Sequence, residues 1–125
     1  MDKLDEISRK RKKAHQKLLA LKSEVYESFL QMERATYADG ALPKKTKELI
    51  AIGISVLMDC ESCMQWHIDQ AAACGATQQE ILEAMEVGIE MGAGRVTVSA
   101  RFALDVMDRA FSPNPKGCTA AERAG

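Results

Sequence analysis

The 125-residue sequence predicts an all-α protein, because apolar residues recur at intervals of three and four along most of the chain. No segment alternates convincingly between apolar and polar residues, as a half-buried strand does. Aromatic residues make up only 5% of the chain, so the core depends on Leu, Ile, Val, Met and Ala, a mixture that suits closely packed helices. We expect one domain, since a chain of this length builds a single core.

The N-terminal third predicts one long helix or two shorter ones over Asp2–Met32, with Ser23 as a cap of the second. A loop is expected at Tyr37–Pro43, where Asp-Gly is a turn signal. The next helix should cover Pro43–Met58. Its second half, Leu49–Met58, is almost wholly apolar, and a small domain can hardly cover such a helix on all sides. We therefore expect a subunit interface there.

The following elements are predicted from their capping residues. Asp59 is expected to cap a helix over Cys60–Ala73, which ends before Gly75. A T-x-x-E capping box should open the next helix, and a Gly-Ala-Gly break should separate it from a last helix at 95–111. The residues expected to face the core in these last two helices are Ile81, Leu82, Met85, Ile89, Val98, Phe102, Leu104 and Met107.

The chain is accordingly divided into an N-terminal helical segment at 1–36, a core at 37–111 and a disordered tail at 112–125. A net charge of −1 argues against nucleic acid or an anionic membrane as a partner. The basic run Arg9–Lys13 is interpreted as the solvated side of a helix, with a nucleic-acid patch as the alternative. The polar N-terminus and the absence of a long apolar run favour a cytoplasmic protein.

Four cysteines without an export signal are more consistent with catalytic, metal-bound or reduced thiols than with a structural disulfide framework. Cys60 and Cys63 form a C-x-x-C pair, and His67 follows one helical turn later. On a helix these three side chains share one face. A helix N-terminus stabilises a thiolate, and a nearby imidazole can accept the thiol proton. A thioredoxin-like protein is a poor fit, because that fold needs strands.

Two other interpretations of these residues stay open. The pair and His67 could bind zinc, although the remaining candidates, His15, Cys74 and Cys118, lack the spacing for a fourth ligand. The cysteines could also be inert and buried.

Glu48 lies twelve residues before Cys60 and completes the pattern E-x11-C-x-x-C-x3-H. With the Leu-Pro helix start at Leu42, the Gly-Ala-Thr turn at Gly75 and the small-residue break at 92–94, this pattern resembles the alkylhydroperoxidase D-like proteins of the carboxymuconolactone decarboxylase superfamily. The resemblance covers about Leu42–Asp108.

The resemblance implies thiol-dependent reduction of a hydroperoxide, or disulfide exchange with a lipoyl-type or thioredoxin-type dithiol, without a metal or cofactor. It further implies that Glu48 and His67 draw the proton from Cys63, and that Cys60 closes the disulfide. The position nearest the helix end favours Cys60 instead as the attacking thiol. Ser62 departs from members that carry a second histidine there. Single-repeat members form homo-oligomers, so a hexamer or trimer is expected.

Two further function classes stay open beside this antioxidant peroxidase. A lyase like the decarboxylases that name the superfamily would need no cysteine pair. A non-catalytic helical assembly module would use the helices alone, with the thiols unaffected by peroxide.

Overall fold

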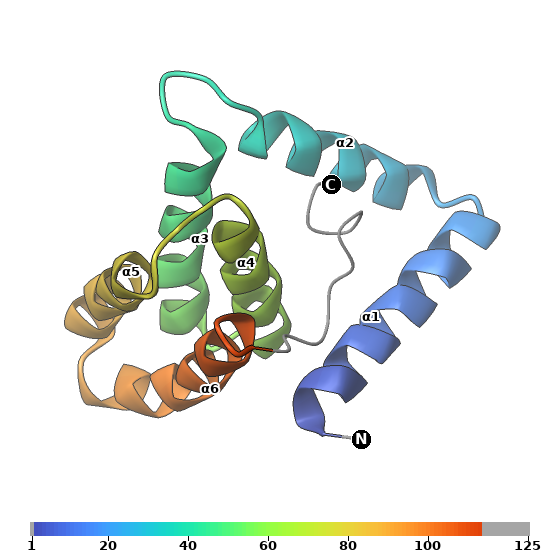
Figure 1. The fold of residues 1–125 in the computed structure, drawn as a ribbon. Helices are drawn as coiled ribbons and strands as arrows, with labels where there is room; N and C mark the ends of the chain where they lie inside the picture. The colour runs from blue at the N-terminus through green and yellow to red at the C-terminus, as the bar shows by residue number, and fades with distance from the viewer. Residues whose placement is uncertain (1, 114–125) are drawn as a thin grey trace.

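The computed structural model describes residues 2–113, and within this range the secondary structure is entirely helical. The predicted all-α fold is therefore confirmed. Figure 1 shows the helices in chain order. Their bounds are α1 Lys3–Ala20, α2 Glu24–Tyr37, α3 Lys44–Met58, α4 Glu61–Ala73, α5 Gln78–Gly92 and α6 Gly94–Ala110.

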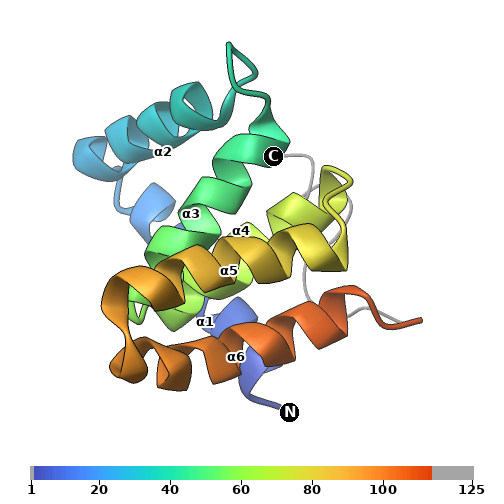
Figure 2. The same ribbon diagram turned by 90° about the vertical axis from the view of Figure 1, so that its left-hand side faces the viewer.

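The core lies among α3, α4, α5 and α6, and its most deeply buried residues come from all four helices. Figure 2 shows α5 crossing α3. At this crossing Gly53 faces Gly88, and a Cβ atom added to Gly88 would lie only 2.5 Å from the Gly53 carbonyl oxygen. Two glycines therefore let the two helix backbones touch. The large apolar side chains that are fully buried in the core are Ile52, Val56, Met64, Ile68, Ile81, Met85, Val96 and Val106.

The helices α1 and α2 form a V beside this bundle (Figure 1). The tip of α1 is attached to α4, where the Gln65 side-chain amide donates to the Leu4 carbonyl at 3.1 Å and to the Ser8 hydroxyl at 2.8 Å. An ion pair between Arg109 and Asp5 at 3.2 Å fixes the same end to α6. By contrast, α2 buries none of its residues. The start of α1 is thus fixed to α4 and α6, whereas α2 contributes no buried residue.

Several local predictions are confirmed. The predicted N-terminal helical region is two helices, and the Ser23 hydroxyl accepts a hydrogen bond from the Tyr26 N–H at the start of α2. Thr77 and Glu80 form a complete capping box at the start of α5. Gly75 has a φ of +90° after the end of α4, a conformation that glycine adopts without strain.

The prediction that Asp59 caps α4 is wrong. Asp59 ends α3 in the left-handed conformation, with a φ of 56°, and Cys60 is the N-cap of α4. The reason is that α3 and α4 follow each other with a two-residue corner. A residue with positive φ makes that corner, and Asp is among the few non-glycine residues that adopt this conformation readily.

The inward face of α6 was also predicted wrongly in part. Val98 is 56% exposed and Leu104 is 39% exposed, whereas small residues of α6 meet the core. The buried residues of α6 recur every three or four positions from Val96 onward and so form one face of the helix, and Val98 and Leu104 lie outside this face. The buried residues of α6 are Val96, Ser99, Ala100, Ala103, Val106 and Met107.

The structure covers only the first two residues of the predicted tail at 112–125, and Cys118 lies outside the described residues. None of the helices in residues 2–113 has the length and apolar character of a membrane-spanning segment.

Candidate functional site

The cysteine pair is located at the start of α4. Cys60 caps the helix, and its sulfur accepts a hydrogen bond from the Cys63 N–H at 3.4 Å. The two Cα atoms are 5.2 Å apart and the two sulfurs are at disulfide distance. Unpaired N–H groups and the positive end of the helix dipole surround this position, and both favour negative charge on sulfur. The arrangement can therefore support both a thiolate and a disulfide.

Glu48 of α3 and His67 of α4 form a second pair. His67 Nδ1 lies 3.1 Å from Glu48 Oε1, so the ring N–H at this position donates to the carboxylate. Glu48 is only 1% exposed, and its other oxygen, Oε2, has no hydrogen-bond partner in the described part of the chain. Because Nδ1 carries the proton that the carboxylate accepts, the other ring nitrogen, Nε2, has a free lone pair and can accept a proton.

The α3–α4 corner turns α4 back along α3, so that His67 of α4 reaches Glu48 near the start of α3. His67 follows Cys63 by one turn on the same face of α4, and Glu48 comes from the adjoining α3. The structure thus brings the four residues predicted from sequence, Cys60, Cys63, His67 and Glu48, to neighbouring positions on α3 and α4.

Tyr37, the last residue of α2, was not among the predicted site residues. Its ring packs against the His67 imidazole, with 5.2 Å between ring centroids. Burial, followed by the charges of Glu48 and Glu33, raises the pKa of the Tyr37 hydroxyl above its ordinary value. Sequence offered no signal for this contact, because Tyr37 lies thirty residues before His67 and was expected to begin a loop.

A hollow of about 160 Å³ adjoins Glu48 between the end of α2, the start of α3 and α4. Its volume could hold a few water molecules. The residues that line this hollow are Glu33, Arg34, Tyr37, Ala38, Lys44, Glu48, Trp66 and Gln70.

The other cysteine that the structure describes, Cys74, is a free thiol at the far end of α4. Within residues 2–113, no three His, Cys, Asp or Glu side chains gather as a metal site would require.

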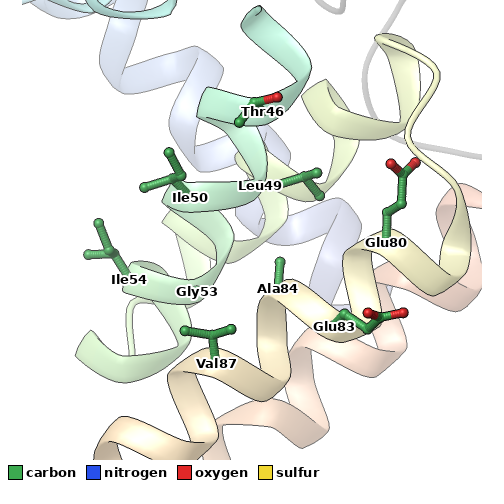
Figure 3. Close-up of a pocket in the computed structure, with 9 residues that line it drawn as sticks. All are labelled: Thr46, Leu49, Ile50, Gly53, Ile54, Glu80, Glu83, Ala84 and Val87. Atoms are coloured by element: carbon green, nitrogen blue, oxygen red, sulfur yellow. The ribbon is translucent and has the colours of Figure 1, made fainter. Parts of the chain in front are cut away.

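A separate surface pocket of about 510 Å³ lies between α3 and α5 (Figure 3). It is lined mainly by apolar side chains, and it includes none of the four predicted site residues. Its walls include Ile50 and Ile54 of α3 and Val87 of α5, all of which are exposed.

Two proteins of known sequence resemble this chain over about two thirds of its length. A curated relative from Paracoccus denitrificans, named uncharacterized protein 4 in cox locus, is 40% identical over 82 residues, which cover 66% of this chain and 74% of the relative. An uncharacterized protein of Cupriavidus necator is 36% identical over 81 residues, which cover 65% of this chain and 72% of the relative.

Two solved structures share the fold of this chain. A carboxymuconolactone decarboxylase family protein from Legionella pneumophila, solved in its apo form, superposes with a TM-score of 0.84 at 30% identity, covering 90% of this chain and all of that one. A Thermotoga maritima protein gives a TM-score of 0.75 at 25% identity, covering 82% and 87% of the two chains. It is described as a member of the same family with a suggested involvement in the antioxidative response.

The sequence profile of the carboxymuconolactone decarboxylase family matches residues 23–105, most of the chain. This match extends from the start of α2 almost to the end of α6 and includes the four residues of the candidate site. The chain therefore belongs to the carboxymuconolactone decarboxylase family.

Proposed function

We propose that this protein is a thiol-dependent oxidoreductase of the alkylhydroperoxidase D-like type, which reduces hydroperoxides with electrons from a dithiol. One observation carries the proposal. Two sulfurs at disulfide distance lie at a helix N-terminus, one turn before an imidazole that a buried carboxylate holds. The suggested antioxidative involvement of the Thermotoga relative supports the same activity.

The reaction begins with a thiolate on Cys63. Its sulfur attacks the terminal oxygen of the hydroperoxide, so that an S–O bond forms, the O–O bond breaks and the alkoxide leaves as an alcohol after taking a proton. The resulting sulfenic acid on Cys63 is attacked by the Cys60 thiol, which forms the disulfide and releases water. An external dithiol, of lipoyl or thioredoxin type, then reduces the disulfide by exchange and becomes oxidised itself.

In this cycle His67 takes the proton from Cys63 and returns it to the leaving oxygen. Glu48 fixes the imidazole through Nδ1 and stabilises the imidazolium while it carries the proton. The Cys63 N–H that reaches the Cys60 sulfur assists the second thiol as it becomes a nucleophile. Since both thiols must be regenerated, the protein needs a compartment that supplies dithiols, such as the cytoplasm.

We also propose that the protein acts as a homo-oligomer, a hexamer or trimer. One group of exposed apolar side chains lies on α3 and α5, where Ile50, Ile54, Met58, Val87 and Met91 are between about half and two thirds exposed. Several of them border the pocket in Figure 3. A second copy that covers this face would remove the apolar surface from water. Light scattering coupled to size-exclusion chromatography measures the assembly directly.

The test of the proposed activity is peroxide consumption with lipoyl-type and thioredoxin-type reductants supplied separately. We expect turnover with at least one of them, and its loss in both Cys60→Ser and Cys63→Ser. Cys74→Ser is the matched control, because this thiol lies at the other end of the same helix, and it should retain turnover. If peroxide is not consumed with either reductant, the proposal is wrong.

The same variants separate the alternative functions. A lyase would retain its turnover of a lactone acid in the Cys60→Ser and Cys63→Ser variants. A non-catalytic assembly module would show the same free thiol content before and after a pulse of peroxide.

A further inference from the structure

The α2 helix reaches the candidate site through its last residue, Tyr37. The phenol ring packs against the His67 imidazole, with 5.2 Å between the ring centroids and an angle of 35° between the ring planes. The proposed cycle gives this side chain no part. Since α2 buries none of its residues, the ring does not belong to a hydrophobic core. The contact therefore acts on the imidazole and not on the packing of a core.

The connection between α2 and α3 holds Tyr37 in place. Directly after Tyr37, the Ala38 carbonyl accepts a hydrogen bond from Lys47 Nζ at 2.7 Å. The Asp39 side chain accepts one from the Lys44 N–H, also at 2.7 Å. Both lysines lie in the first turn of α3, the helix that carries the buried carboxylate of the site. The phenol ring is therefore fixed relative to α3 as well as to α2.

A single hydrogen bond leaves the plane of the imidazole poorly defined. His67 Nδ1 lies 3.1 Å from Glu48 Oε1, which limits the position of one ring atom. Rotation of a histidine ring about its Cβ–Cγ bond has a broad energy well, and a hydrogen bond tolerates changes of angle. With this bond alone the ring could rock, and the direction of the Nε2 lone pair would change with it.

The Tyr37 ring restricts this motion because it contacts the imidazole from a second helix. The His67 side chain is only 13% exposed, so little free space surrounds it. Glu48 of α3 holds the ring by a hydrogen bond, and Tyr37 of α2 holds it by packing. A base that is kept in one orientation takes a proton faster than a base that must first find that orientation.

We infer that Tyr37 is a positioning residue of the proton relay, whose aromatic ring fixes the orientation of the His67 imidazole that Glu48 holds. This inference rests on the proposed function, in which His67 takes the proton from Cys63. The contact is made by the ring, so phenylalanine should replace Tyr37 in this role and an aliphatic residue should not.

Three variants of the full-length, reduced protein test the effect on activity, measured as the single-turnover rate of reduction of tert-butyl hydroperoxide. Tyr37→Leu removes the ring and should slow the reaction by about tenfold, a part of the 10²–10⁴-fold that a positioned base contributes. Tyr37→Phe keeps the ring and should retain the wild-type rate. Tyr26→Leu is the matched control, the same substitution in the same helix at a ring that contacts His15 instead, and it should also retain the rate.

Proton NMR of the histidines reports the ring contact itself. The chain has two histidines and two tyrosines, and Tyr26 lies 5.5 Å from His15 as Tyr37 lies 5.2 Å from His67. An aromatic ring shifts the resonances of protons next to it. Tyr37→Leu should therefore move the imidazole resonances of His67 and leave those of His15, which also shows that the variant is folded. Tyr26→Leu should do the reverse, and Tyr37→Phe should leave both histidines near their wild-type positions.

Three results would overturn the inference. If Tyr37→Phe is as slow as Tyr37→Leu, the hydroxyl acts and not the ring. If Tyr37→Leu reacts at the wild-type rate, the ring contact has no effect on the relay. If Tyr26→Leu is as slow as Tyr37→Leu, the effect belongs to α2 as a whole and not to the ring on His67.

Failure of the proposed function would look different, because the wild-type protein would then not reduce the hydroperoxide. Alkylation of the reduced protein by iodoacetamide, followed at each cysteine by peptide mass mapping, still tests the relay. Tyr37→Leu should slow alkylation of Cys63 relative to Cys74, which lies about two turns beyond His67 at the end of α4, and Tyr37→Phe should not. An unchanged ratio of the two alkylation rates in Tyr37→Leu would overturn the inference independently of any peroxidase activity.

Discussion

Replacing Glu48 by Gln separates the chemistry of the site from its contribution to stability. The carboxylate is 1% exposed, one of its oxygens binds His67 at 3.1 Å, and the other has no partner among the described residues. A glutamine of the same shape keeps an oxygen that can accept from the imidazole. It removes the negative charge that stabilises the imidazolium.

The two effects of Glu48→Gln on stability oppose each other. A hydrogen bond to a charged group contributes about 1.5–3 kcal/mol and a neutral one about 0.5–1.5 kcal/mol, so roughly 1 kcal/mol is lost. The substitution also removes a buried negative charge from a carboxylate whose second oxygen has no hydrogen-bond partner among the described residues, and this stabilises the folded state by a comparable amount. We expect the free energy of unfolding to change by less than about 1 kcal/mol, and the midpoint of thermal unfolding by less than about 5 °C.

The effect of Glu48→Gln on activity should be much larger. A positioned acid or base contributes about 10²–10⁴-fold to a rate, and loss of the group that orients it should reduce kcat by about 100-fold. Steady-state peroxide consumption and thermal unfolding by circular dichroism measure the two quantities on one preparation. Glu86→Gln, an exposed carboxylate on α5, is the control and should change neither.

Full activity in Glu48→Gln would refute the role of this carboxylate in the relay. Loss of activity together with a fall of several kcal/mol in stability would also refute the reasoning, because Glu48 would then act by holding α3 against α4 and not by charge.

Three further predictions concern stability. Gly88→Ala should destabilise the protein by about 1–3 kcal/mol in urea unfolding, because the new Cβ would lie 2.5 Å from the Gly53 carbonyl oxygen and force α3 and α5 apart; an unchanged midpoint would contradict this. Thr77→Ala removes the hydroxyl that accepts from the Glu80 N–H and should cost about 1 kcal/mol in the same assay. Burial, and then neighbouring carboxylates, raise the pKa of Tyr37 above 10.0, so the unfolded chain loses this proton first and the folded state loses stability as pH rises beyond about 10. Tyr37→Phe should lessen that alkaline loss, and parallel pH profiles of the two proteins would contradict it.

Local sequence signals predicted most of the fold. The Thr77–Glu80 capping box, Gly75 after α4 and the Ser23 cap each depend on a few neighbouring residues, so their structural effect could be predicted from those residues alone. The cap of α4 was assigned to the wrong residue. The geometry of the two-residue corner after α3 made Asp59 the end of one helix and Cys60 the start of the next.

The long-range packing of the helices could not be predicted from the sequence. On α6, periodicity alone could not tell that the face with small residues would meet the core while Val98 and Leu104 stayed outside. The contact of Tyr37 with His67 depends on how α2 stands against α4, and no short-range pattern encodes that. Cys60, Cys63 and His67 could be grouped before the structure because they lie within two turns of one predicted helix, whereas Glu48 was added only through the resemblance to the alkylhydroperoxidase D-like pattern.

The most direct test of the proposed redox cycle is the intact mass of the fully reduced chain before and after a short peroxide pulse. The proposed cycle predicts that the chain loses two hydrogens, that peptide mapping places the new disulfide between Cys60 and Cys63, and that a dithiol restores the original mass. Oxygen atoms added elsewhere, or two thiols that survive the pulse, would contradict it.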